Sequence, residues 1–347
     1  MANVKPKITL AVAVVLVLAI GAVTVHHYKT KSKVDVIRVS DNTTAPSGWD
    51  LVQHLTGRDL LKEKGVKLEK VPGVATGAPP FQAVLTGQLD VAGGDWLGWI
   101  NVIARGGKVR ALFATSALTK SSIGHTGLLV LNESPIHSVQ DLKGKSIGVN
   151  TLGLGAELVI KILLKKHGFS ATDAQLLIVP DINEEQVLRS HQVDAAGGTT
   201  AGGPWFELTK ARGGVRIVEG TDRYAVYGSQ DTTMVGGGFR EDFIRDHPDT
   251  VRRYVEAVKE SQKIIWDAFQ ADPAKVRKAY SDISEEKGGN PLLGQYYIPN
   301  PPEALKIHER DIQFCIDFLI DEGKLKPGQV KPSDIYKGDF EPPVLSR

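Results

Sequence analysis

The sequence has little cysteine, little net charge and few aromatic residues. Cys315 is the single cysteine in 347 residues, so no disulfide framework holds the chain together. A net charge of +2 creates no strongly basic field, which argues against nucleic acid as a partner. Aromatic residues make up 7% of the chain, but 41% of its residues are hydrophobic and 24% are charged, which excludes intrinsic disorder. We therefore expect a folded globular protein, and its length favours two domains.

Motifs of common enzymes are also missing. Gly144-Lys145-Ser146 ends like a P-loop, but Val139 replaces the first glycine of that motif, and a strand follows where one should precede. Gly153-Leu154-Gly155 lacks the third glycine of a dinucleotide-binding turn, and no GxSxG string occurs. The histidines have no metal-ligand spacing. We therefore expect no metal, no cofactor and no catalytic residue.

Residues 1–33 have the pattern of a targeting segment. Lys5 and Lys7 precede an uninterrupted run of apolar or small residues at positions 8–25. That run lies at the lower length limit of a membrane-spanning helix, and it also fits a signal peptide cut near Ala19-Ile20-Gly21. We expect either a signal peptide or an anchor in the cytoplasmic membrane. Both place the rest of the chain in the periplasm or a similar extracytoplasmic compartment.

An internal repeat is the most informative feature of the sequence. Segments 36–39, 66–72 and 88–94 correspond in order to segments 146–149, 174–180 and 192–198. The closest match is between the strings QLDVAGG and QVDAAGG, and we expect Asp90 and Asp194 to tie the turns after their strands. Two copies at this spacing predict two similar α/β lobes rather than a solenoid.

Strand-like segments alternate with helical ones in each copy, which predicts βαβ units and mostly parallel sheets. Helical spacing predicts a helix at about 156–167, Pro248 is expected to begin another, and a third is expected at about 302–322. Gly127 to Leu131 and Thr232 to Gly238 are interpreted as two crossovers. Lobe 1 is then expected to comprise residues 34–130 plus 234–347, and lobe 2 residues 131–233.

Turns rich in glycine and hydroxyl groups follow several of the predicted strands. Ligands of open α/β sheets bind beyond the carboxyl ends of the strands, and the free N–H groups of helix starts attract anions. We predict that a ligand lies between the lobes. The predicted contacts are Asn42, Thr43, Gly94, Asp95, Trp96 and Thr115 from lobe 1, and Thr151, Gly153, Gly155 and Thr199 from lobe 2. For each polar residue among them, helix capping is the structural alternative.

Residues 81–94, the string DLKGKSIGV at 141–149 and the helix start at 247–253 together carry a family resemblance. From about Val34 to the C-terminus, the chain resembles the substrate-binding proteins of ABC importers for alkanesulfonates, taurine and nitrate. The resemblance implies a type II periplasmic-binding fold with two lobes and two crossovers. It also implies that a small anion is captured between the lobes and passed to an ABC permease in the membrane.

Two other functions stay open. An aromatic sulfinate desulfinase uses the same fold, with a nucleophilic cysteine after the first strand, but residues 42–46 contain no cysteine. A membrane-anchored sensor that reports the ligand to a partner protein is the second alternative. We expect a monomeric binding protein rather than an enzyme. Because no arginine lies in the candidate turns, a singly charged or amphiphilic ligand is favoured over a phosphate ester.

Overall fold

The computed structural model describes residues 35–41, 45–74, 79–122, 124–197, 203–228 and 230–338. The targeting segment at 1–33 and three predicted ligand contacts, Asn42, Thr43 and Thr199, lie outside these residues. Within the described part of the chain, no helix has both the length and the apolar composition needed to cross a membrane. Strands alternate with helices from β1 to β9, as the sequence predicts.

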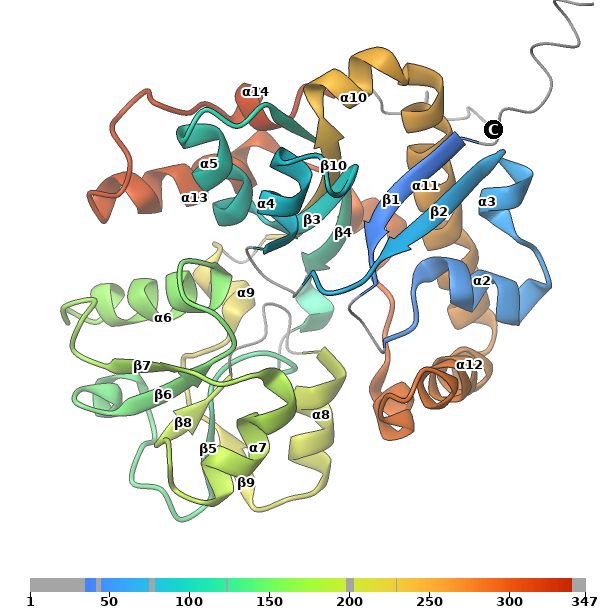
Figure 1. Ribbon diagram of the computed structural model, residues 1–347. Coiled ribbons are helices and arrows are strands. Elements are labelled where there is room, and N and C mark those ends of the chain that lie inside the picture. The colour runs from blue at the N-terminus through green and yellow to red at the C-terminus, as the bar shows by residue number, and fades with distance from the viewer. Residues whose placement is uncertain are drawn as a thin grey trace, which may run out of the picture.

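The described residues contain ten strands in three sheets. Their orders are β1-β2, β3-β10-β4 and β7-β6-β8-β5-β9. The strands are β1 (Asp35–Ser40), β2 (Val66–Val71), β3 (Val91–Asp95), β4 (Val109–Leu118), β5 (Leu129–Leu131), β6 (Ser146–Val149), β7 (Gln175–Ile178), β8 (Ala195–Ala196), β9 (Val215–Ile217) and β10 (Thr232–Arg240). Figure 1 shows the five-stranded sheet at the lower left and the two smaller sheets above it and to the right.

The sheets are mixed in direction, whereas the sequence predicts mostly parallel sheets. β1 is parallel to β2, and β6 is parallel to both β7 and β8. β10 is antiparallel to β3 and β4, and β5 is antiparallel to β8 and β9. The difference arises because both predicted crossovers become strands, β5 and β10. Each of these strands joins its sheet from outside the βαβ units of that sheet. Its direction therefore does not have to match theirs.

The internal repeat is visible in the hydrogen bonds of two aspartates. The Asp90 carboxylate accepts the Arg38 backbone N–H at 2.8 Å, and the Asp90 N–H donates to the Arg38 carbonyl at 3.0 Å. Asp194 and Ser146 form the same two bonds at 2.8 and 2.9 Å. The aspartates therefore tie the first strand of each repeat rather than the turn after their own strand. By this criterion Arg38, and not Val36, corresponds to Ser146.

The helices cover these sheets. The α-helices are α2 (Gly48–Thr56), α3 (Leu60–Glu63), α4 (Pro79–Leu85), α5 (Trp96–Ala104), α6 (Gly155–Lys166), α7 (Asp181–Arg189), α8 (Gly203–Ala211), α9 (Arg223–Val226), α10 (Glu241–Asp246), α11 (Pro248–Ala271), α12 (Pro273–Glu286), α13 (Glu309–Asp321) and α14 (Pro332–Ile335). Short 3-10 helices are η1 (Lys120–Ser122), η2 (Val139–Leu142), η3 (Pro291–Tyr296) and η4 (Pro302–Leu305).

Two of the predicted helices are confirmed and one is wrong. α6 matches the predicted helix at 156–167, and Pro248 is the first residue of α11, where a missing N–H costs no hydrogen bond. The single helix expected at 302–322 is instead η4 followed by α13. Lys306 between them is extended, and the next residue, Ile307, is buried in the core. The extended segment between η4 and α13 therefore contributes the apolar side chain of Ile307 to the core.

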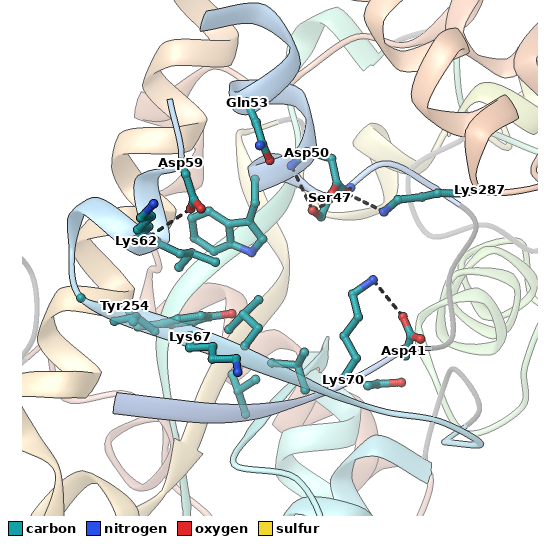
Figure 2. Close-up of a pocket in the computed structure, with 18 residues that line it drawn as sticks. Asp41, Ser47, Asp50, Gln53, Asp59, Lys62, Lys67, Lys70, Tyr254 and Lys287 are labelled. Carbon is teal, nitrogen blue, oxygen red and sulfur yellow. Dashed lines mark hydrogen bonds and ion pairs between the residues drawn. The ribbon is translucent and has the colours of Figure 1, made fainter. Parts of the chain in front are cut away.

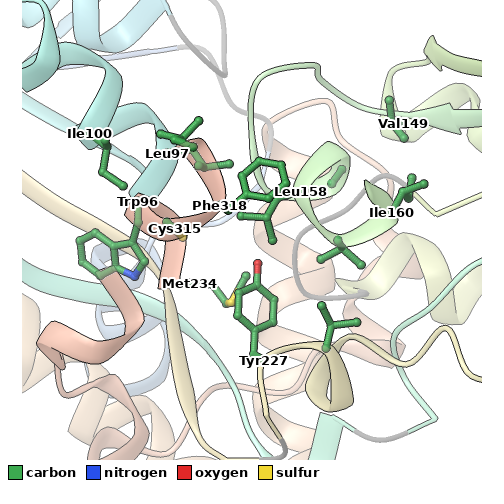
Figure 3. Packing of buried hydrophobic residues seen from close by; sticks show 14 of the residues in the cluster. Trp96, Leu97, Ile100, Val149, Leu158, Ile160, Tyr227, Met234, Cys315 and Phe318 are labelled. Carbon is green, nitrogen blue, oxygen red and sulfur yellow. The ribbon is translucent and has the colours of Figure 1, made fainter. Parts of the chain in front are cut away.

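The largest apolar core joins the elements of different sheets. It contains buried side chains of α5, α6 and α13, including Trp96, Leu158 and Phe318 (Figure 3). Cys315 lies in this core with 4% of its surface exposed, as the sequence predicts. Through this core, α6 packs against α5 and α13, which in turn contact β3 and β10.

Glycines let β10 occupy the middle of its sheet. A Cβ at Gly238 would overlap the Arg110 backbone carbonyl on β4, and a Cβ at Gly236 would lie 2.6 Å from the Trp96 ring. At Gly93 on β3, in contrast, a Cβ would meet only ordinary contact, at 3.7 Å. Close approach of neighbouring backbone and side chains therefore requires glycine at positions 236 and 238.

Candidate functional site

The turn after β3 meets the start of α6. Asp95 caps α5 by accepting the Gly98 N–H at 3.0 Å, and its other carboxylate oxygen accepts the Gly155 N–H at 2.7 Å. Leu154, at the N-cap of α6, provides no side-chain cap, so Asp95 fulfils that role from another part of the chain. Burial raises the pKa of Asp95 to about 6, although its backbone hydrogen bonds act in the opposite direction. Two predicted site residues, Asp95 and Gly155, are thus in direct contact.

The turn before α6 is likewise occupied by a carboxylate of the chain. The Gly153 N–H donates to Glu157 at 2.5 Å, and Glu157 also pairs with the Lys161 ammonium at 2.7 Å. Thr151 is half-buried, and its hydroxyl lies 3.4 Å from the Asn150 side-chain oxygen. The N–H groups of Gly153 and Gly155 therefore already have anionic partners, whereas Thr151 makes only this long contact.

Trp96 is buried, and the partly exposed Gly94 packs closely against Phe81. Trp96 is 2% exposed, and its indole N–H donates to the Thr233 carbonyl at 2.7 Å. A Cβ at Gly94 would lie 2.6 Å from the ring of Phe81. Both residues support the turn after β3, and neither presents a side chain to an open space.

Thr115 borders a small cavity. It lies at a β-bulge of β4, since Val235 pairs with Ser116 but Gly236 pairs with Ala114. Bulges redirect side chains, and Thr115 is exposed at a cavity of about 270 Å³. Gln262 and Asn300 also line this cavity, and their amides bond to the Ala114 and Ala117 backbone. Among the predicted contacts that the structure describes, only Thr115 reaches this cavity.

A larger cavity of about 630 Å³ lies between the β1-β2 sheet and helices α2, α3 and α11 (Figure 2). It shares Trp49 and Tyr254 with the smaller cavity. Its lining is Val39, Ser40, Asp41, Ser47, Trp49, Asp50, Gln53, Asp59, Leu61, Lys62, Gly65, Val66, Lys67, Leu68, Lys70, Val91, Tyr254 and Lys287. The sequence analysis does not select Trp49 as a site residue. Its position directly after Ser47-Gly48, at a helix start beyond the first strand, is nevertheless a recognisable signal.

Ion pairs surround the larger cavity at its charged end. Lys70 pairs with Asp41 at 3.1 Å, and Lys287 pairs with Asp50 at 2.5 Å. Asp50 also accepts the Ser47 N–H at 2.7 Å, which completes the capping box of α2. Across the described residues, no group of three histidine, cysteine, aspartate or glutamate side chains is placed to hold a metal ion.

Comparison with known proteins relates the chain to binding proteins. Residues 115–275 match the family described as NMT1/THI5 like. A protein of Bacillus subtilis (strain 168) named as an aliphatic sulfonates-binding protein is 27% identical over 231 residues, 65% of this chain and 63% of that protein. The match therefore spans less than two thirds of this relative's length.

Solved structures share the fold at low sequence identity. The periplasmic aliphatic sulphonate-binding protein of Escherichia coli has a TM-score of 0.65 at 18% identity, covering 86% of this chain and 91% of its own. The alkanesulfonate-binding protein of Xanthomonas axonopodis pv. citri, solved bound to MOPS, gives 0.65 and 18%, covering 87% and 98%. A desulfurization enzyme also shares the fold, with a TM-score of 0.55 at 17% identity over 84% and 93%. The chain therefore shares the fold of these solved structures, and its residues 115–275 match the NMT1/THI5-like family.

Proposed function

We propose that this protein is an extracytoplasmic solute-binding protein. It captures a small sulfonate-, taurine- or nitrate-like anion between two lobes and delivers it to the membrane permease of an ABC importer. The observation that carries this proposal is the contact between Asp95 and Gly155, because it brings the turn after β3 in one repeat against the helix start in the other. The fold shared with sulfonate-binding proteins supports the same function.

The proposal assigns residues 34–130 plus 234–347 to lobe 1 and residues 131–233 to lobe 2. The five-stranded sheet is built from residues 129–217, and the other two sheets use strands outside that range. β5 begins at Leu129 and β10 at Thr232, each two residues before the proposed bounds. Residues 1–33 would direct the chain across the cytoplasmic membrane or anchor it there, and the protein would act as a monomer.

Within the predicted site, we assign ligand contact to the hydroxyl and amide side chains of Asn42, Thr43, Thr115, Thr151 and Thr199. Gly94, Asp95, Trp96, Gly153 and Gly155 hold the turns in place instead. The Asp95 carboxylate already occupies the start of α6, where a second anion would be repelled. Neutral hydroxyl groups bind an oxyanion without that repulsion.

Cys315 supports binding rather than catalysis. A desulfinase needs an accessible thiolate, but the Cys315 thiol is buried, and burial raises its pKa well above the ordinary value. Residues 42–46 after β1 contain no cysteine. The thiol of this chain is therefore unsuited to nucleophilic attack.

Thermal shift tests the proposed function. Ethanesulfonate, taurine or nitrate should raise the melting temperature relative to chloride at equal ionic strength, because the ligand binds only the native state. Thr151→Ala should weaken binding of the active anion several-fold and leave the melting temperature of the free protein unchanged. Thr172→Ala, an exposed threonine in the turn after α6, is the matched control. A lowered melting temperature with unchanged affinity would assign Thr151 to helix capping only.

A further inference from the structure

The larger cavity exceeds what nitrate or a short alkanesulfonate needs. Its volume of about 630 Å³ lies within the range of pockets that enclose drug-sized molecules. Asp41 and Ser47, which line it, stand in sequence on either side of residues 42–44, where the proposed function places two ligand contacts. The cavity therefore offers room for a bulky group.

Two aromatic rings form one wall of this cavity. The centroids of Trp49 and Tyr254 lie 5.7 Å apart, with the rings tilted by 59°. Trp49 is partly exposed, and Figure 2 shows the Tyr254 hydroxyl directed toward the middle of the lining residues. Leu61, Val66 and Leu68 complete an apolar surface. Such a wall favours a flat apolar group, because aromatic rings prefer tilted or offset contact with one another.

An ammonium group faces the same space. Side chains alternate along a strand, so Val66, Leu68 and Lys70 share one face of β2. Figure 2 shows Lys70 rising from the strand toward Asp41. The side chains of this pair are 59% and 44% exposed, and exposed pairs contribute little, so Lys70 is available to another anion. The lining contains four lysines and three aspartates, which leaves one positive charge in excess.

We propose that the ligand is a singly charged amphiphilic anion with an aromatic body. Its ring lies in the larger cavity, which residues of lobe 1 alone line, against Trp49 and Tyr254. Lys70 adds an ammonium contact to the sulfonate or carboxylate group, beside the hydroxyl and amide contacts that the proposed function assigns. This assignment rests on the proposed function and narrows its substrate class. Trp49 is then the residue that selects aromatic over short aliphatic anions.

Calorimetric titration of the whole chain compares three probes: naphthalene-2-sulfonate, 2-naphthoate and ethanesulfonate. We expect naphthalene-2-sulfonate to bind one per chain and at least tenfold more tightly than ethanesulfonate, because it buries far more apolar surface. The 2-naphthoate titration distinguishes a sulfonate from a carboxylate as the preferred anionic group.

Variants locate the binding site. Trp49→Ala should remove most of the preference for naphthalene-2-sulfonate without changing the affinity for ethanesulfonate. Trp49→Phe should retain the preference, because it keeps an aromatic ring at this position. This variant shows whether the loss in Trp49→Ala comes from the missing ring or from misfolding. Lys70→Met should weaken all three probes several-fold. Lys326→Met, at an exposed lysine that does not line the cavity, should change none of them.

The outcomes separate this inference from the proposed function. Equal affinity for naphthalene-2-sulfonate and ethanesulfonate would overturn the aromatic assignment and leave anion binding intact. A preference that survives in Trp49→Ala would place the ring elsewhere and also overturn it. Failure of every probe, together with no thermal shift by taurine or nitrate, would overturn both proposals.

Discussion

Asp95 makes the pH dependence of stability a test of the contact between α5 and α6. The side chain is 7% exposed and accepts N–H groups from Gly98 and Gly155. Burial raises its pKa from 3.8 to about 6. Between these values the native state holds a proton that the unfolded state has lost. The free energy of unfolding therefore decreases as the pH rises from about 4 to about 6.

The size of this effect follows from the pKa difference. A shift of one pKa unit corresponds to about 1.4 kcal/mol, so moving from 3.8 to about 6 costs the ionised native state about 3 kcal/mol. Asp95→Asn removes the ionisation and keeps one acceptor oxygen. The NH2 group of the asparagine cannot accept the second N–H, and the loss of that hydrogen bond lowers the free energy of unfolding by about 1 kcal/mol at every pH. The pH-dependent part therefore isolates the buried charge.

Urea unfolding followed by circular dichroism at pH 4.5 to 7.5 measures this difference. Relative to the unsubstituted protein, Asp95→Asn should gain about 2 kcal/mol between pH 4.5 and pH 7.5, because at pH 4.5 the unfolded aspartate has already lost most of its proton. Asp194→Asn is the matched control, and its difference from the unsubstituted protein should stay nearly flat over this pH range. Although burial acts the other way, the Ser146 N–H and hydroxyl lower the pKa of Asp194 below its ordinary value of 3.8, so the group stays ionised in both states and its stabilising effect is lost only at lower pH. A flat difference for Asp95→Asn would show that this carboxyl group does not titrate in the window, and the reasoning from burial would be wrong.

Three further experiments test the packing of β10, the tie within the repeat and the reactivity of the thiol. Gly238→Ala should lower the free energy of unfolding by about 3 kcal/mol in urea titrations, because the new methyl group overlaps the Arg110 carbonyl. The control Gly93→Ala should change it by no more than about 0.5 kcal/mol, and equal effects of the two substitutions would contradict the close approach of β10 to β4. Asp90→Ala should cost about 2 kcal/mol by the same measurement, since it breaks the tie to Arg38, and an unchanged midpoint would remove the structural role of the repeat. Cys315 should react with a disulfide reagent only on unfolding, and the protein should release no sulfite from an aromatic sulfinate; sulfite release abolished by Cys315→Ala would refute the binding-protein assignment.

Local patterns predict the elements better than their pairing. The apolar spacing of α6 predicts its position to within one residue. Pro248 marks the start of α11 through its missing N–H. The antiparallel position of β10 depends on contacts with β3 and β4 that no local pattern contains. Strand direction therefore had to come from the structure.

In the predicted site, too, local patterns identify residues but not the partners that those residues contact. Sequence identifies Gly153 and Gly155 as N–H donors at a helix start, but not that Glu157 and Asp95 accept those bonds. It also selects Trp96 as a ligand contact, although Trp96 is buried and Trp49 borders both cavities. Trp96 is buried because Gly236 on β10 leaves space for its ring in the core, a contact between distant segments that no local pattern contains.

The position of β10 also constrains the order in which the chain acquires its structure during synthesis. β3 and β4 do not pair with each other; each pairs with β10, which is made only after every strand of the five-stranded sheet. The segment from β5 to β9 has all its strand partners in one continuous stretch and can form its sheet first. Until residue 240 emerges, β3 and β4 present unsatisfied edges that invite pairing with other chains. A nascent chain of this protein is therefore most prone to aggregation just before its tenth strand is complete, and a holdase that binds extended apolar segments should protect it at that stage.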